Sequence, residues 1–147
     1  MGSQERPEFR EIDQNDIRSV LARNQVGRLA FTAGGEVDIR PLHYAYSAGK
    51  IYGRTSPGAK FIAISELPAK VAFEVDEVES VFHWTSVIAR GRFQVLSAHG
   101  TDAEEWRMAV GLLRRVIKDA FLDEDPVPER DVIFCITVEE TTGRAAK

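Results

Sequence analysis

The residues of this sequence best suited to hold a charged ligand lie in the segment GRTSPGAK, Gly53–Lys60. Thr55 and Ser56 carry hydroxyl groups, and Arg54 and Lys60 flank them with positive charge. Apolar residues with helical spacing follow, so the segment would stand at a helix N-terminus, where unpaired N–H groups and the helix dipole attract anions. Two interpretations stay open: a phosphate site with charge-assisted hydrogen bonds, or a capped turn whose hydroxyls serve only the helix.

No other pattern in the sequence supplies an evident catalytic group. His43, His83 and His99 are scattered, with no carboxylate or cysteine at ligand spacing, so no metal site is predicted. The Walker spacing and the G-x-S-x-G nucleophile motif are both absent. Cys135 lies inside an apolar run, which favours a buried, unreactive thiol. A phosphate cradle without an acid, base or nucleophile suits a protein whose reactive atom belongs to a bound cofactor.

The composition is that of one ordinary globular domain. The chain has 147 residues, of which 44% are hydrophobic and 29% are charged. Its net charge of −4 argues against a general binder of nucleic acid or of anionic membranes. One cysteine permits no internal disulfide, so a reducing, cytoplasmic setting is expected. No apolar run approaches the roughly 20 residues of a membrane-spanning helix.

The elements that must position the candidate residues are mainly strands. A hydrophobic period of two predicts strands over 26–33, 36–46, 50–55, 69–78, 80–97 and 132–140. Glycine turns join the first three into an antiparallel meander, and Pro41 indicates a sheet edge or a bulge within the second. Helices are expected near 13–27, over 57–66 and over 101–121. So many strands with little helix to cover them predict a closed or nearly closed small barrel, since closure removes exposed edges.

The order of these pieces carries a family resemblance. The motifs RPLHYAY, IYGRT, SPGAK, KVAFEVDE, WTSVIARGR and TGR follow one another as in the FMN-binding split-barrel family, the family of pyridoxamine 5′-phosphate oxidase. The chain is most similar to the short flavoproteins related to nitroimidazole-resistance proteins. The resemblance implies a mainly β fold, a six-stranded antiparallel split β-barrel of Greek key type with short flanking helices and one longer helix. It covers a single domain over residues 13–144, preceded by a flexible N-terminal arm over 1–12.

The resemblance also implies which residues of the predicted strand over 36–46 meet the cofactor. Family members bind FMN at the interface of a homodimer, with the flavin ring across the barrel wall. Arg40 would face the phosphate or the ring region. The backbone of Pro41, Leu42 and His43 would lie along the ring, although Pro41 has no N–H to donate. His43 stands near a histidine implicated in the chemistry of some relatives, and a partly buried structural histidine is the alternative.

Two further groups of cofactor-binding residues are implied. Ser86 falls where the family places a polar contact to the flavin, and Trp84 is near enough to stack on the ring or to border it. A core aromatic on an alternating strand is the alternative for Trp84. The phosphate-holding segment corresponds to Arg54, Thr55, Ser56 and Lys60.

The activity implied is that of an FMN-dependent oxidoreductase that passes electrons from reduced flavin to a small planar acceptor. FAD or a deazaflavin is less favoured than FMN. The expected partners are a second copy of the chain and the small-molecule acceptor, with no nucleic acid and no membrane. The oxidase's substrate-binding C-terminal extension has no counterpart after Ile133 beyond Arg144, so true pyridoxamine phosphate oxidase activity is not expected. A non-catalytic flavin- or haem-binding carrier or sensor, and a cofactor-free dimeric barrel, remain as alternatives.

Overall fold

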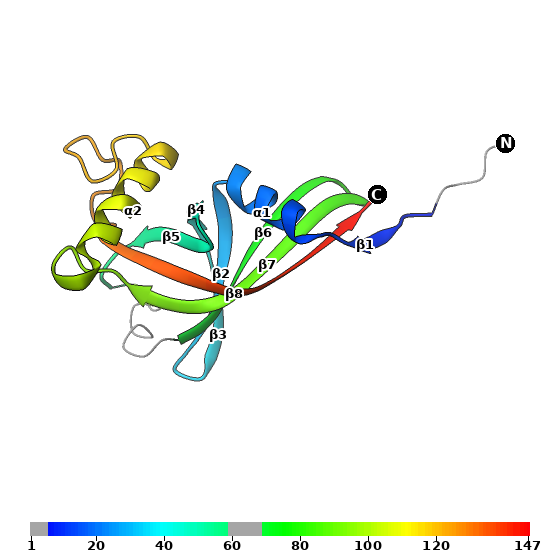
Figure 1. Ribbon diagram of the computed structural model, residues 1–147, viewed down its shortest axis with the longest axis horizontal. Coiled ribbons are helices and arrows are strands. Elements are labelled where there is room, and N and C mark those ends of the chain that lie inside the picture. The colour runs from blue at the N-terminus through cyan, green and yellow to red at the C-terminus, as the bar shows by residue number, and fades with distance from the viewer. Residues whose placement is uncertain (1–5, 59–68) are drawn as a thin grey trace.

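The structure is a computed structural model, and it describes residues 6–58 and 69–147. Its strands form one antiparallel sheet that curls into a barrel, accompanied by two α-helices (Figure 1). The elements are β1 (Phe9–Glu11), α1 (Gln14–Arg23), β2 (Val26–Ala33), β3 (Glu36–His43), β4 (Ala45–Ser47), β5 (Lys50–Thr55), β6 (Ala69–Ser80), β7 (His83–Val95), a 3-10 turn (Gly100–Asp102), α2 (Ala103–Val116) and β8 (Val132–Ala146). Neither α1 nor α2, the helices of the described ranges, has the length and the apolar run that a membrane-spanning helix requires. Most of the helix predicted over 57–66 lies outside the described residues.

The barrel closes through one interrupted strand. The sheet order is β3-β2-β6-β7-β8-β5-β4, so the strands at its two ends, β3 and β4, are neighbours in sequence. They are separated only by Tyr44, whose N–H donates to the Gln25 carbonyl and whose buried hydroxyl donates to the Leu21 carbonyl. The segment therefore pairs with β2 before Tyr44 and with β5 after it. This confirms the predicted split-barrel class. The described strands number eight rather than six, because the second predicted strand is divided at Tyr44 and β1 is added.

Both chain ends contribute more strand than the sequence predicts. Residues 9–11, expected within the flexible arm, form β1 and pair with the end of β8. The strand β8 continues to Ala146, well past the predicted end at 140. Its inward positions there are small: Gly143 leaves no room for a side chain, since a Cβ would lie 2.6 Å from Ile12 Cγ1. Because glycine and alanine have small side chains, their alternation does not appear in the sequence as the hydrophobic pattern of a strand.

The core has two parts, on the two faces of β5 and β8. Ile51 and Phe134 point into the barrel, where they join a cluster that includes Phe73 and α1 residues. Ile133 and Cys135 point outward and pack under α2. Cys135 is fully buried, as predicted, and burial raises the pKa of its thiol to about 11. The described helices leave the outer face of β3, β2 and β6 uncovered, and this decides where a ligand or a second chain can approach (Figure 1).

Candidate functional site

The strand segment Arg40–His43 lies at an open edge of the sheet. Pro41 is opposite Arg28 of β2, and no other described strand pairs with β3 over these residues, which agrees with the edge that Pro41 predicted. Leu42 packs against the barrel core, whereas His43 is exposed. The side chain of Arg40 is half exposed and lies 3.5 Å from an oxygen of Asp38. Alternate N–H and C=O groups on this edge are therefore open to a ligand.

The seam of the barrel brings this segment to the end of β5. The register of β4 with β5 pairs Ala45 with Tyr52. That pairing ends at Ala45, because the Tyr44 N–H donates to the Gln25 carbonyl instead, and β3 and β5 remain in contact beyond it. The strand β3, which carries one group of predicted site residues, thus lies against β5, which carries Arg54 and Thr55 of the other group.

Arg54 is committed mainly to a buried ion pair. Its Nη1 and Nη2 atoms donate to the two oxygens of Asp125 at 2.5 and 3.0 Å, and both side chains are 3% exposed. The guanidinium carbon also lies 5.1 Å from the centre of the Phe121 ring. The Nε–H is buried and has no hydrogen-bond partner in the described structure. Arg54 is therefore engaged in a structural ion pair, and its one unpaired N–H is enclosed within the described structure.

Asp125 is a residue that the sequence analysis missed. It accepts further hydrogen bonds from the backbone N–H groups of Phe121 at 2.7 Å and Val127 at 2.9 Å. The hydrogen bonds from Arg54, followed by these two backbone groups, hold the pKa of its carboxyl well below the usual range. The chain after α2 is thereby fastened onto β5. The only sequence signal was an arginine inside an apolar strand, which needs a carboxylate, but the acidic segment 123–131 offers several.

Thr55 and Ser56 complete the described part of the predicted phosphate segment. Thr55 is 6% exposed. Ser56 is half-buried at the end of β5. Lys60, the remaining member of the segment, lies outside the described residues. The described part thus supplies two hydroxyl groups at the end of β5, and strand alternation points the Thr55 side chain to the opposite face from the Arg54 guanidinium.

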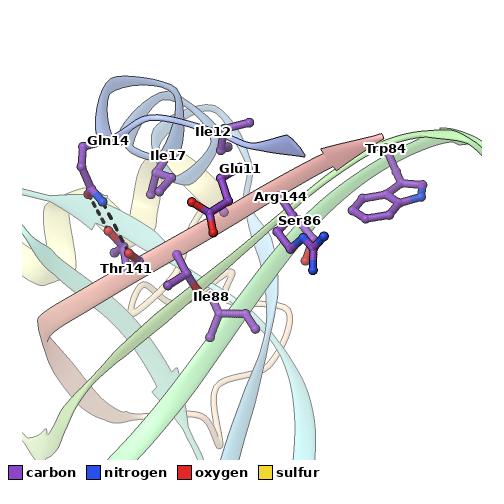
Figure 2. A pocket seen from close by; sticks show the side chains of 11 residues that line it. Glu11, Ile12, Gln14, Ile17, Trp84, Ser86, Ile88, Thr141 and Arg144 are labelled. Atoms are coloured by element: carbon purple, nitrogen blue, oxygen red, sulfur yellow. Dashed lines mark hydrogen bonds between the residues drawn. The ribbon is translucent and has the colours of Figure 1, made fainter. Parts of the chain in front are cut away.

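Trp84 and Ser86 line a separate cavity of about 350 Å³ between β1, α1, β7 and β8 (Figure 2). The Ser86 hydroxyl donates to Glu74 at 3.1 Å. Trp84 belongs to neither core cluster, and its ring centre lies 6.2 Å from that of Phe9. The full lining is Glu11, Ile12, Gln14, Ile17, Trp84, Ser86, Ile88, Thr141, Thr142, Gly143 and Arg144.

Among the polar side chains that line this cavity, Gln14 and Thr141 are hydrogen-bonded to each other, whereas Arg144 forms no ion pair with a described residue. Gln14 and Thr141 bind each other: the Gln14 amide donates to the Thr141 carbonyl at 3.4 Å, and the Thr141 hydroxyl donates to Gln14 Oε1 at 2.7 Å (Figure 2). Arg144 stands opposite Glu11 in the register, yet the two side chains make no ion pair. The cavity therefore combines an indole, aliphatic side chains and a guanidinium that no described carboxylate neutralises.

The predicted site residues at the seam lie far along β8 from the other predicted pair, Trp84 and Ser86. Arg54 is opposite Ile133, and Ser86 is opposite Arg144, eleven residues further along β8. That interval corresponds to about 36 Å of extended strand, and β8 runs along the length of the barrel (Figure 1). One chain therefore presents two separate surfaces, the seam of β3 with β5 and the cavity beside β7. No cluster of His, Cys, Asp and Glu suited to a metal ion occurs in the described ranges.

An antiparallel barrel closed through a divided strand is the fold of the split-barrel class of proteins. Residues 13–145 match the protein family described as pyridoxamine 5′-phosphate oxidase, and the chain belongs to this family. It is 30% identical over 146 residues to an uncharacterised protein of Rhizobium meliloti (strain 1021), covering 93% of this chain and 95% of that protein. The family resemblance found in the sequence is thereby confirmed.

Solved structures show the same fold over nearly the whole chain. A FAD-binding protein from Mesorhizobium loti is 29% identical, with a TM-score of 0.76 and coverage of 95% of this chain and 99% of that one. A conserved protein of unknown function from Corynebacterium diphtheriae is 30% identical, with a TM-score of 0.70 and coverage of 93% and 97%. A protein provisionally assigned to 5-nitroimidazole antibiotic resistance, from Bacteroides thetaiotaomicron VPI-5482, is 21% identical, with a TM-score of 0.71 and coverage of 97% and 90%, and shares the fold.

Proposed function

We propose that the protein binds a flavin mononucleotide group, as FMN or as half of FAD, and transfers electrons from it to a small planar acceptor. The observation that carries this proposal is the seam, where the edge of β3 over Pro41–His43, which no described strand pairs, lies in contact with β5, the strand that ends at Thr55. A relative with 29% identity over nearly the same length is a FAD-binding protein, which supports a flavin as the ligand.

The residues of the seam suit the two ends of such a ligand. A phosphate accepts hydrogen bonds, and the end of β5 carries the hydroxyl groups of Thr55 and Ser56 as donors. A flat ring needs an apolar surface and a few polar groups at its rim, which Pro41, Leu42 and the open backbone edge of β3 offer. When bound, the flavin supplies the redox chemistry, and the chain's own residues bind it, orient it and exclude water.

A second copy of the chain would bring the cavity of Trp84 and Ser86 to the seam. Within one chain these residues lie at the other end of β8. The uncovered outer face carries large exposed apolar side chains, which on a soluble domain mark an interaction surface. They include Val26 (48% exposed), Val37 (78%), Ile39 (59%) and Val78 (66%). A two-fold dimer that buries this face is the simplest arrangement that completes the site from both chains.

The experiment is a titration of flavin-free protein with FMN, followed by flavin fluorescence. Lys60→Ala should weaken FMN binding by about 1.5–3 kcal/mol, the usual contribution of a charged hydrogen bond. Thr55→Val should weaken it by about 1 kcal/mol, since a neutral hydrogen bond is lost. Lys118→Ala removes an exposed lysine after α2 and is the matched control. Affinity that is the same in all four proteins would remove the seam from the binding site.

A further inference from the structure

The solvent-facing side of α2 gathers positive charge that no described carboxylate neutralises. Arg107, Arg115 and Lys118 are exposed, and none of them forms an ion pair with residues 6–58 or 69–147. Arg107 and Arg115 are about two helical turns apart and so share one side of the helix, and Lys118 follows just past its end. Met108 and Gly111 lie between them on the same side. We call these five residues the basic face.

The ordinary explanation for such cations accounts for only part of the basic face. A cation near the C-terminus of a helix is stabilised by the helix dipole, which suits Arg115 and Lys118, but Arg107 lies in the second turn of α2. The exposed carboxylates nearest in sequence, Glu104 and Asp123, form no ion pair with any of the three within the described ranges. The whole chain has a net charge of −4, so this local excess of positive charge opposes the sign of the protein and attracts an anionic partner.

The shape of the basic face favours a small, charged interface. A Cβ added at Gly111 would meet no described atom within 4 Å, so a partner can approach the helix backbone at this position. Met108 is 45% exposed and is the one large apolar side chain of the basic face. Transient electron-transfer complexes bury less than about 1,200 Å² and depend on complementary charge, whereas permanent interfaces are large and apolar. The basic face has the properties of the transient class.

The position of the basic face leaves it free in the proposed dimer and close to the seam. The helix α2 packs on the outer side of β5 and β8, whereas the proposed dimer buries the outer face of β3, β2 and β6 (Figure 1). Phe121 follows Lys118 by three residues, at most about 11 Å of chain, and its ring centre lies 5.1 Å from the Arg54 guanidinium carbon. Arg54 directly precedes Thr55 at the end of β5. A protein docked on the basic face would therefore stand beside the proposed flavin site.

We infer that the basic face docks a small acidic electron-carrier protein that reduces the flavin. This inference rests on the proposed function, which needs a source of electrons. A one-electron carrier, such as an acidic [2Fe–2S] protein, is oxidised by one electron at each docking event. Two reduced carriers and two protons from water convert one oxidised flavin to its two-electron-reduced form, and two oxidised carriers leave. Weak binding suits this exchange, because the first oxidised carrier must dissociate before the second one docks.

The test measures the binding of an acidic plant-type [2Fe–2S] ferredoxin by calorimetry, to the flavin-free and to the FMN-loaded protein. Arg107→Gln with Arg115→Gln removes two cations of the basic face. Arg10→Gln with Lys147→Gln is the matched control, since it removes two exposed cations at the other end of β8. The first variant should bind ferredoxin roughly three- to tenfold more weakly, because two exposed ion pairs are lost, and the control should stay within about twofold. Both should keep the FMN affinity of the unaltered protein.

Further measurements separate docking from a change elsewhere in the protein. Gly111→Glu places a carboxylate at the centre of the basic face and should weaken ferredoxin binding more than Gly111→Gln, which has the same size without the charge. Raising the ionic strength from about 0.01 M to about 0.15 M should weaken binding by the unaltered protein and bring the affinities of the variants closer together. The rate of FMN reduction by reduced ferredoxin should fall with the affinity, whereas reduction by dithionite, a small ion that needs no docking surface, should not change.

The outcomes distinguish the inference from the proposed function. Ferredoxin that does not bind at low ionic strength, or that binds all the variants equally, would overturn the inference even where FMN binds. Tighter binding of phosphatidylserine vesicles or of duplex DNA, sensitive to the same variants, would assign the basic face to that partner and overturn the inference too. Failure of FMN to bind would overturn the proposed function, and the titrations of flavin-free protein with ferredoxin would still decide whether the basic face is a docking surface.

Discussion

Replacing Asp125 by asparagine would leave the Arg54 guanidinium charged and buried without its carboxylate. Asparagine keeps the size of the side chain and removes the charge, so the substitution isolates the ion pair. Both side chains are 3% exposed, so water cannot replace the lost partner. Breaking a buried pair in this way typically costs about 3–5 kcal/mol. That is a large part of the roughly 5–15 kcal/mol by which a domain is stable.

The assay is urea unfolding followed by circular dichroism, with a thermal melt beside it. The expected loss of about 3–5 kcal/mol corresponds to a fall in Tm of roughly 6–20 °C for a chain of this length. The control is Glu139→Gln, which removes a pair with Arg92 whose side chains are about half exposed. It should cost less than about 1 kcal/mol. A loss below about 1 kcal/mol for Asp125→Asn would refute the claim that this pair fastens the chain after α2 to β5.

A double variant and a pH series test the same reasoning independently. Arg54→Met combined with Asp125→Leu leaves no buried charge and should recover at least half of the lost stability. The carboxyl pKa of Asp125 is lowered in the folded state, so its contribution is fully present above the ordinary pKa of aspartate, near about 3.9. The unfolded chain takes up the proton first as the pH falls below that value. Stability should therefore decline steeply with acid, and less steeply in the double variant.

Two further predictions concern the space around two glycines and the burial of a tyrosine. Gly91→Ala should destabilise the protein by about 1–3 kcal/mol in urea unfolding, since a Cβ there would lie 2.0 Å from the Thr137 carbonyl oxygen. Gly111→Ala, in α2 with open space around it, should instead stabilise by about 0.5–1 kcal/mol, and the same sign for both would contradict the structure. Burial raises the pKa of Tyr44, so the folded state keeps a proton that the unfolded chain loses near about pH 10. Stability should fall as the pH rises past that value, and Tyr44→Phe should flatten the decline; an unchanged slope would count against a buried phenol.

Much of the fold could be predicted because its strands alternate strongly. Val71, Phe73 and Val75 show the period of two directly, and the structure places all three inside the barrel. A closed or nearly closed barrel was predicted, but the way it closes was not, because closure depends on Tyr44 interrupting a strand that then pairs on both sides. The extension of β8 escaped notice because its inward positions are glycine and alanine, whose small side chains give no hydrophobic signal.

The candidate site was predicted as a set of residue types rather than as one surface. The family order identified β3 and the end of β5, and the seam brings these together. The order of the motifs could not show that Arg54 pairs with Asp125, because the segment 123–131 holds several acidic residues and only the folded structure determines which one reaches Arg54. The separation of Ser86 from Arg54 follows from strand register, which no local pattern contains.

The most direct measurement of the central claim is the visible absorption spectrum of the purified protein, before and after adding flavin and desalting. FMN and FAD are tested in parallel. The account predicts that the bands of oxidised flavin stay with the protein and titrate to saturation. Loss of flavin on desalting, together with no saturable binding of either nucleotide, would contradict it and reduce the segment Gly53–Lys60 to a capped turn.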